Sequence, residues 1–274
     1  MELWFTEKQT AGVGITCKVQ RTLHHEKTPF QTLDVIETEE FGRMLVLDGM
    51  VQTTERDEFV YHEMIVHVAM QTHPNPERVA VIGGGDGGAV REVLKYPNVK
   101  EVRLIEIDER VVEASRSYFP ELSRGLSDPR AKCLFVDGIE HVKNNPGAYD
   151  VILIDSTEPV GPAVGLFERD FYESVFNSLT ERGVMVAQTE SPFFNADLIK
   201  RAFGAVRSIF PISRLYLASI PTYPSGLWSF SLGSKSVDPL DVSPRLDGIE
   251  TRYYTAGVHK AAFELPAFVQ ELVG

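Results

Sequence analysis

From residue 78 onward, short apolar runs alternate with stretches of helical periodicity, and this alternation constrains the fold more than any other feature of the chain. Consecutive apolar residues are typical of strands that are buried on both faces of a sheet. Such strands run parallel when helices connect them. The runs are RVAVIGG (78–84), VRLIEID (102–108), AKCLFVD (131–137), YDVILID (149–155) and GVMVAQTE (183–190). We therefore expect an α/β fold with a mostly parallel sheet.

The last two strands of the series should differ from the others. Residues 213–220 and 227–234 are joined by PTYPSG, which is too short for a helical crossover, so this pair should form an antiparallel hairpin. Five parallel strands followed by a hairpin indicate a methyltransferase-like Rossmann sheet more than a dehydrogenase sheet.

The first part of the chain has a different pattern. It contains four strand-like segments, at residues 15–23, 31–38, 43–49 and 51–55, and the turn Asp48-Gly49 is a strong hairpin signal. Helical spacing then begins at about residue 58. The sequence thus predicts a small antiparallel β domain over residues 1–57 and a Rossmann-like catalytic domain over residues 58–274.

Composition excludes several classes of protein. Of the 274 residues 43% are hydrophobic, which is typical of a folded chain, and the only cysteines, Cys17 and Cys133, exclude a disulfide framework or a cysteine-rich metal site. Lys and Arg number 27 against 39 acids, a net charge of -12 that argues against a nucleic-acid partner. No apolar run approaches the roughly 18 residues of a membrane span, and no signal peptide is visible. We expect a cytoplasmic protein with no membrane partner.

A glycine-rich loop follows the first strand of the series. Gly83, Gly85 and Gly88 satisfy G-x-G-x-x-G, and Glu106 ends the next strand, as in a dinucleotide site. Asp86 argues against that ligand, because a carboxylate inside the loop would repel a pyrophosphate. The loop is better suited to a cation such as a sulfonium or an ammonium. A loop acid that bonds only local amides is the alternative for Asp86.

Acids also follow the second and third strands. Glu106 can accept hydrogen bonds from both hydroxyls of a ribose, and Asp137-Gly138 could read an adenine amino group. Helix N-capping is the alternative for both acids.

The end of the fourth strand is the most informative stretch. Asp155 and Glu158 lie three residues apart, and Pro159, Gly161 and Pro162 follow. Ligands bind at the carboxyl edge of such sheets. With Asp86, these acids predict a strongly negative pocket with no basic residue nearby to neutralise it. A polycation explains them better than a divalent metal, because the loops offer few further ligands and no histidine. We expect no metal.

Together these motifs closely resemble the spermidine synthase family of aminopropyltransferases. The matching segments are GGGDGG, IEID, VDG, D-S-x-[DE]-P-x-G-P-A, LVLDGMVQTTERDEFVYHEM (45–64), HPNP (73–76), IPTYPSG (220–226) and YYTAGVHKAAFELP (253–266). The resemblance implies transfer of an aminopropyl group from decarboxylated S-adenosylmethionine, a co-substrate and not a cofactor, to putrescine. It also implies a homodimer or homotetramer.

The resemblance assigns roles residue by residue. Asp155 is similar to the family's proton acceptor. Positions similar to nucleoside contacts are Gln31, Gly83, Gly85, Glu106, Asp137, Gly138 and Pro162. Positions similar to amine contacts are Trp4, Tyr61, His62, Asp86, Asp155, Ser156, Thr157, Glu158, Gln188 and Tyr223.

Several alternatives stay open at this stage. Glu158 is often Asp in the family and His62 is often Gln, so the acceptor could be cadaverine, agmatine or spermidine. His62 could also be a helix residue bonded to a neighbouring loop, and Gln31 a surface glutamine. A methyltransferase that acts on a cationic amine would use the same sheet, but Asp86 and Asp155 would repel its cofactor's carboxylate. A non-enzymatic polyamine-binding protein would need the acids without a nucleoside site.

Overall fold

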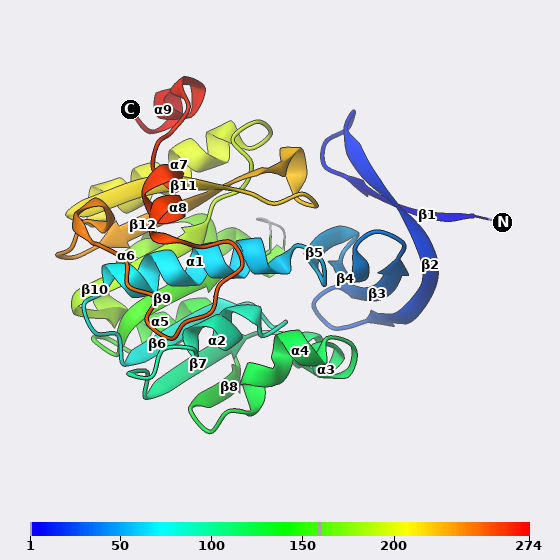
Figure 1. Ribbon diagram of the computed structural model, residues 1–274, viewed down its shortest axis with the longest axis horizontal. Helices are drawn as coiled ribbons and strands as arrows, with labels where there is room; N and C mark the ends of the chain where they lie inside the picture. The colour runs from blue at the N-terminus through cyan, green and yellow to red at the C-terminus, as the bar shows by residue number, and fades with distance from the viewer. Residues whose placement is uncertain (1, 158–160) are drawn as a thin grey trace.

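A computed structural model describes residues 2–157 and 161–274 and arranges them around two β-sheets (Figure 1). The small sheet consists of β1 (Leu3–Lys8), β2 (Gly14–Lys27), β3 (Thr32–Thr38), β4 (Gly42–Leu47) and β5 (Met50–Thr54). The large sheet consists of β6 (Arg78–Gly83), β7 (Glu101–Glu106), β8 (Ala131–Phe135), β9 (Tyr149–Asp155), β10 (Leu179–Gln188), β11 (Ile212–Ser219) and β12 (Leu227–Ser234).

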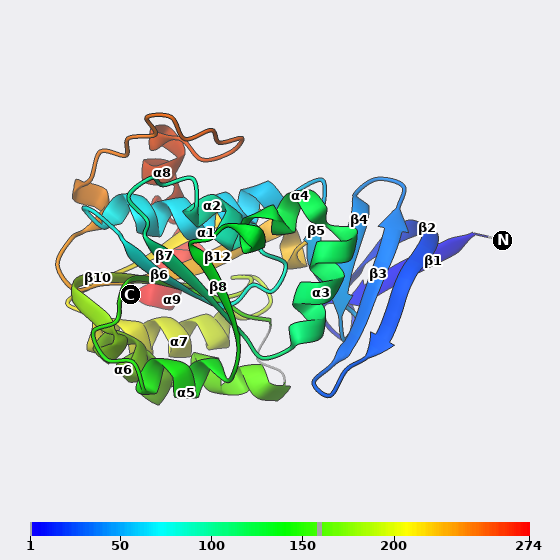
Figure 2. The ribbon, with the colours of Figure 1, turned by 90° about the horizontal axis from the view of Figure 1, so that it is seen from below.

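Helices connect the strands of the large sheet and cover both of its faces (Figure 2). The α-helices are α1 (Glu58–Thr72), α2 (Gly88–Val93), α3 (Glu109–Tyr118), α4 (Pro120–Ser123), α5 (Gly138–Lys143), α6 (Arg169–Ser178), α7 (Ala196–Ile209), α8 (Ala256–Ala262) and α9 (Ala267–Val273). The 3-10 helices are η1 (Arg124–Ser127), η2 (Gly161–Phe167), η3 (Pro224–Gly226) and η4 (Pro239–Asp241). Within the described ranges, none of these helices combines the length and the apolar character needed to cross a membrane.

The large sheet has the order β11-β12-β10-β9-β6-β7-β8. Strands β6 to β10 pair in parallel, whereas β12 is antiparallel to both β10 and β11. Residues 220–226 join β11 to β12, and so short a connection can only turn back on itself. The predicted parallel sheet with a terminal hairpin is confirmed.

Alternate residues of the central strands belong to two separate cores. In β6, Val79 and Val81 pack in the core that includes α1 and α2, whereas Ala80 and Ile82 pack in the core that includes α5, α6 and α7. This division follows from the two-residue period of a strand. Because each face needs apolar side chains, these strands read as continuous apolar runs.

The small sheet is an antiparallel meander that packs against α3 and α4. Leu33 and Val35 of β3 meet Val111 and Phe119 in one apolar cluster. Strand β1 was not predicted, because LWFTEK is short and carries both polar and apolar residues without a turn signal before it. The contact with α3 brings the small sheet beside the carboxyl edge of the large one.

Helix α1 leads from the small sheet into the large one, and the C-terminal part of the chain crosses it (Figure 1). We call residues 242–255, between η4 and α8, the strap. The Glu63 carboxylate of α1 accepts backbone N–H bonds from Arg252, Tyr253 and Tyr254 of the strap, each at 2.8 Å. Glu63 is only 2% exposed. Glu63 therefore holds the C-terminal part of the strap against α1, and Gln71 of α1 holds its N-terminal part through two hydrogen bonds with the backbone of Arg245.

Replacing Glu63 with Ala should lower the free energy of unfolding by about 3 kcal/mol, because three backbone donors lose a charged acceptor. Urea denaturation measures the change. The exposed Glu264 provides a control, and Glu264→Ala should stay within about 0.5 kcal/mol of the parent protein. A Glu63→Ala protein as stable as this control would show that the strap is held by other contacts.

Candidate active site

One cavity collects the ends of the central strands and is closed on one side by the small sheet. The large sheet and its connections contribute Tyr61, Ile82, Gly83, Gly84, Gly85, Asp86, Ile105, Glu106, Ile107, Val111, Asp137, Gly138, Ile139, Asp155, Ser156, Thr157, Leu166, Gln188, Tyr223, Pro224 and Trp228. The small sheet and its loops contribute Phe30, Gln31, Leu45, Leu47, Asp48, Met50, Val51 and Gln52. Most of the residues predicted from the sequence are therefore brought together.

The glycine loop passes directly against the end of β9. Gly83 pairs with Asp155 in the parallel register and has a φ of +77°. A Cβ atom on Gly83 would lie 2.2 Å from the carbonyl oxygen of Asp155. Only glycine permits both the left-handed backbone and this approach. The loop can then continue through Asp86 into α2.

The buried Glu106 is the last residue of β7, and its carboxyl group lines the cavity beside Gly85. Its Oε1 accepts the backbone N–H of Asp108 at 3.0 Å. Burial, aided by the charge of Asp108 and opposed by backbone N–H groups, raises the pKa of Glu106 to about 7. Glu106 does not cap α3, since that role belongs to the side chain of Asp108.

Gln31 lines the cavity from the side of the small sheet, and both Gln31 and Glu106 bond Asp108. Its Nε2 donates to Oδ2 of Asp108 at 3.0 Å, and the Thr28 hydroxyl donates to the same oxygen at 2.7 Å. Asp137 accepts from the backbone N–H groups of Ile139 and Glu140, so it does cap α5 while it lines the cavity beside Gly138. The position of Asp137 is therefore compatible with both predicted roles, capping of α5 and contact with an adenine.

Asp155, the last residue of β9, lines the cavity beside Gly84 and has one carboxylate oxygen in a hydrogen bond and one without. The Tyr61 hydroxyl donates to Oδ1 at 2.6 Å, whereas Oδ2 is buried and has no hydrogen-bond partner among the residues that the structure describes. Burial and the charge of Asp86 raise the pKa of Asp155 to about 6, against the opposing effects of His62 and Tyr61. A carboxylate with a raised pKa and a free oxygen is a good proton acceptor.

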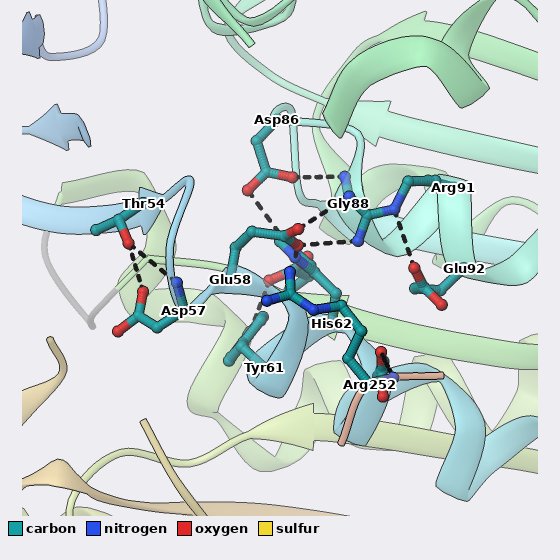
Figure 3. Close-up of polar contacts among 12 residues, drawn as sticks. Thr54, Asp57, Glu58, Tyr61, His62, Asp86, Gly88, Arg91, Glu92 and Arg252 are labelled. Atoms are coloured by element: carbon teal, nitrogen blue, oxygen red, sulfur yellow. Dashed lines mark hydrogen bonds and ion pairs between the residues drawn. The ribbon is translucent and has the colours of Figure 1, made fainter. Parts of the chain in front are cut away.

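Asp86 is backed by a buried cluster of charged side chains (Figure 3). His62 Nε2 lies 3.4 Å from Oδ2 of Asp86, and Nδ1 lies 2.6 Å from Oε2 of Glu58. Glu58 in turn accepts two hydrogen bonds from Arg91, at 2.9 and 3.0 Å. The prediction that no basic residue lies near the acids is therefore wrong, because His62 pairs with Asp86. That prediction considered only the loops that carry the acids, whereas His62 lies on α1 and Arg91 on α2.

His62 carries a positive charge in this cluster. Burial opposes that charge, but Asp86 and Glu58 together raise the pKa of His62 well above its ordinary value. His62 does not line the cavity as the family resemblance implied. Its position agrees with the alternative, a helix residue bonded to a neighbouring loop.

Aromatic and amide side chains line the cavity beside Asp155. The Tyr223 hydroxyl donates to the carbonyl of Gln52 at 2.6 Å, and Gln188 Nε2 donates to the carbonyl of Ser156 at 3.0 Å. Trp228 packs edge-on against Tyr223, with ring centroids 4.8 Å apart. Sequence reasoning missed Trp228 and Gln52. The pairing of β12 with β11 could have identified Trp228, since it places that residue opposite Ala218 just past the loop that carries Tyr223.

Besides His62, three other predicted residues are not described at the cavity. Trp4 lies on β1, is 56% exposed and does not line the cavity. Glu158 lies outside the described residues. Pro162 falls within η2, but its side chain also lies outside the described part of the chain. Within that part, no group of three or more His, Cys, Asp or Glu side chains could hold a metal ion.

Two family models match almost the whole length of the chain. Residues 58–242 match the spermine/spermidine synthase domain, and residues 3–55 match the spermidine synthase tetramerisation domain. Similar curated proteins carry the name polyamine aminopropyltransferase. The one from Caldicellulosiruptor bescii is 60% identical over 274 residues, 100% of this chain and 99% of the relative. The one from Bacillus mycoides is 58% identical, with complete coverage of both chains.

Solved structures give the same result. A spermidine synthase in complex with the transition-state analogue AdoDATO superimposes with a TM-score of 0.97 at 42% identity, covering 99% of this chain and 94% of that one. The spermidine synthase from Thermotoga maritima gives a TM-score of 0.95 at 42% identity, with the same coverage. The similarity thus extends over the arrangement of both sheets.

Two carboxyl groups of the free protein should titrate far above the usual range, Asp155 near pH 6 and Glu106 near pH 7. NMR of protein with ¹³C-labelled Asp and Glu side chains measures both. Asp155→Asn should remove the lower titration and Glu106→Gln the higher. If every carboxyl titrated below pH 5, neither group would be as strongly desolvated as the structure places it.

Proposed function

This chain belongs to the spermine/spermidine synthase family, and on that premise we propose that it transfers an aminopropyl group from decarboxylated S-adenosylmethionine to putrescine, giving spermidine and 5'-methylthioadenosine. One observation supports this most strongly. A single cavity is lined by Glu106, beside Gly85, by Asp155, beside Gly84, and by Asp86 of the same glycine loop. That arrangement suits a molecule with a nucleoside, a sulfonium and an adjacent cationic amine.

The nucleoside occupies the end of the cavity that contains Glu106. In its ionised form, Glu106 accepts hydrogen bonds from both ribose hydroxyls. Asp137 and Gly138 face the adenine, and Gln31 adds a side chain that can both donate and accept. Gly83 and Gly85 let the backbone approach the ligand closely. The family resemblance adds Pro162. Decarboxylated S-adenosylmethionine is consumed in the reaction, so it is a co-substrate, and we propose no further cofactor.

The amine occupies the end that contains Asp155. Asp86 and Asp155 attract a diammonium ion into a cavity that excludes most water, where the attraction between opposite charges is strong. Tyr61, Gln188 and Tyr223 line its path, and the backbone around Ser156 and Thr157 borders it. The family resemblance places Glu158 here as a further acid.

The transfer is a direct displacement at the methylene carbon bonded to sulfur. A neutral amine nitrogen forms the new C–N bond with its lone pair, the C–S bond breaks, and its electron pair goes to sulfur. The sulfonium thereby becomes the neutral thioether of 5'-methylthioadenosine. The nitrogen's surplus proton goes to Asp155. Holding the two reactants in line is the main catalytic contribution, because the sulfonium is already a good leaving group.

The hydrogen bond from Tyr61 makes Asp155 suitable as the proton acceptor. It fixes Oδ1 and leaves Oδ2 to receive the proton. Burial raises the pKa of Asp155 to about 6, which brings it closer to the pKa of an ammonium group. Burial next to a sulfonium lowers the pKa of the ammonium and narrows the gap further.

We propose that the protein is a homotetramer assembled through the small sheet. The match of residues 3–55 to a tetramerisation domain supports this. So does the exposure of large apolar side chains on and beside β1, where Leu3 is 52% exposed, Trp4 56% and Val13 45%. An interface would also explain why Trp4 lies away from the cavity.

Product analysis tests the proposed reaction. The enzyme is incubated with decarboxylated S-adenosylmethionine and, separately, with putrescine, cadaverine, agmatine and spermidine. Putrescine should give equal amounts of spermidine and 5'-methylthioadenosine and the highest kcat/KM. A clear preference for another amine would correct the acceptor, and no 5'-methylthioadenosine with any amine would refute the transfer.

Asp155→Asn should lower kcat by a factor on the order of 10² or more, because the proton acceptor is lost. Calorimetric affinity for 5'-methylthioadenosine should change little, since Asp155 lies at the amine end. The exposed Asp247 gives a matched control, and Asp247→Asn should keep full activity. Turnover of the Asp155 variant within a few-fold of the parent would rule out its role as the base.

A further inference from the structure

The Asp57 carboxylate lies where β5, α1 and the loop between β11 and β12 meet. Asp57 is 5% exposed and does not line the cavity. It comes directly before α1, a position from which an Asp side chain usually caps a helix. Among the described residues, however, this side chain makes no capping bond to α1. A buried carboxylate is costly unless other groups bond it, so its partners show what it holds in place.

Asp57 accepts three hydrogen bonds from two other segments of the chain. Its Oδ2 accepts the backbone N–H of Thr222 at 3.0 Å and the hydroxyl of the same residue at 2.8 Å. Its Oδ1 accepts the hydroxyl of Thr54, the last residue of β5, at 2.5 Å (Figure 3). Thr222 is only 1% exposed and belongs to the loop that joins β11 to β12. Asp57 therefore ties that loop to the small sheet and to the start of α1.

This loop is a tight turn that moves as one piece. The backbone N–H of Ile220 donates to the carbonyl of Gly226 at 2.9 Å, and the N–H of Gly226 donates to the carbonyl of Tyr223 at 2.8 Å. These bonds set the shape of the loop, whereas the bonds to Asp57 set its position against α1. A shift of Thr222 would therefore carry Tyr223 with it.

Tyr223 and Tyr61 form one wall of the cavity. Both line it, and their ring centroids are 5.5 Å apart. Tyr61 lies on α1 one turn after Asp57 and donates to Asp155, whereas Tyr223 directly follows Thr222 in the loop. The two tyrosines on the proposed path of the amine thus belong to two segments that Asp57 joins.

We propose that Asp57 is a positioning residue for amine binding, which holds the loop of Tyr223 against Tyr61. The two rings then form a closed wall beside the proton acceptor. This rests on the proposed function, which places the amine along that wall. Asp57 acts through the loop and does not touch the amine.

The test measures two apparent KM values in the full-length enzyme, each with the other substrate saturating. Asp57→Ala removes all three acceptor bonds, so the KM for putrescine should rise roughly tenfold. The KM for decarboxylated S-adenosylmethionine should stay within about twofold, because the groups proposed to hold the nucleoside are not bonded to Asp57. A general loosening of the fold would raise both values.

Asp57→Asn separates positioning from simple attraction between charges. The amide oxygen can still accept from Thr222, and the amide nitrogen can donate to the hydroxyl of Thr54. The KM for putrescine should therefore stay within about threefold of the parent value although the negative charge is lost.

Asp150→Ala is the matched control. Asp150 lies near the start of β9, whereas Asp155 ends that strand, and it does not line the cavity. It also accepts three hydrogen bonds, from the backbone N–H groups of Glu77 and Arg78 at 3.0 and 2.9 Å and from the hydroxyl of Thr180 at 3.1 Å. Its loss should lower thermal stability and leave both KM values unchanged.

An unchanged KM for putrescine in a folded Asp57→Ala enzyme, or an equal rise of both KM values, would overturn the proposal. So would an Asp57→Asn enzyme as impaired as Asp57→Ala, since the charge alone would then matter. If Asp57→Ala did not fold, Thr222→Val would decide, because it removes one bond between the loop and Asp57 with little change of shape. It should raise the KM for putrescine alone, by roughly threefold.

The proposed function fails in a different way. The parent enzyme would then release no 5'-methylthioadenosine from decarboxylated S-adenosylmethionine and putrescine.

Discussion

Carboxyl groups at the ends of β6, β7 and β9 are held away from water, and the rest of the site is organised around that burial. A carboxylate in such surroundings is unstable unless hydrogen bonds or positive charges surround it. The protein meets this requirement differently for each acid. Glu106 accepts backbone N–H bonds, Asp155 accepts the Tyr61 hydroxyl, and Asp86 is paired with His62.

This stabilisation of the carboxyl groups is incomplete on the side that faces the cavity. Burial still raises the pKa of both Glu106 and Asp155, and Oδ2 of Asp155 has no partner among the described residues. The site therefore retains an excess of negative charge that a cationic ligand can neutralise. Burial of the carboxyl groups is thus the common cause of two effects, because it favours binding of a cation and raises the pKa of Asp155.

The small sheet is part of the site because its residues and loops line one side of the cavity. Gln31 hydrogen-bonds Asp108 across the cavity rim, and the carbonyl of Gln52 accepts the Tyr223 hydroxyl. The loop that carries Tyr223 is also tied to the start of α1, where Asp57 accepts from the backbone and hydroxyl of Thr222 at 3.0 and 2.8 Å. Movement of the small sheet would therefore open the amine end.

Much of the fold and of the site could be predicted from the sequence, because these features depend on residues that are close together in the chain. Continuous apolar runs identified the parallel strands, and GGGDGG with Asp155 identified the carboxyl edge where the acids meet. Contacts between distant segments could not be predicted. Nothing in the residues around Arg91 indicates that its side chain reaches Glu58, 33 positions earlier. Similarly, a motif match does not report that Trp4 is exposed and does not line the cavity.

The buried acids of this site should select a cation that has no neighbouring carboxylate. Isothermal titration calorimetry of the free enzyme measures this selection, with decarboxylated S-adenosylmethionine, S-adenosylmethionine and 5'-methylthioadenosine as ligands at one pH above 7. Because Asp86 and Asp155 repel the methionine carboxylate, the decarboxylated ligand should bind at least roughly tenfold more tightly than S-adenosylmethionine. Equal affinities for these two ligands would show that Asp86 and Asp155 do not discriminate against the carboxylate.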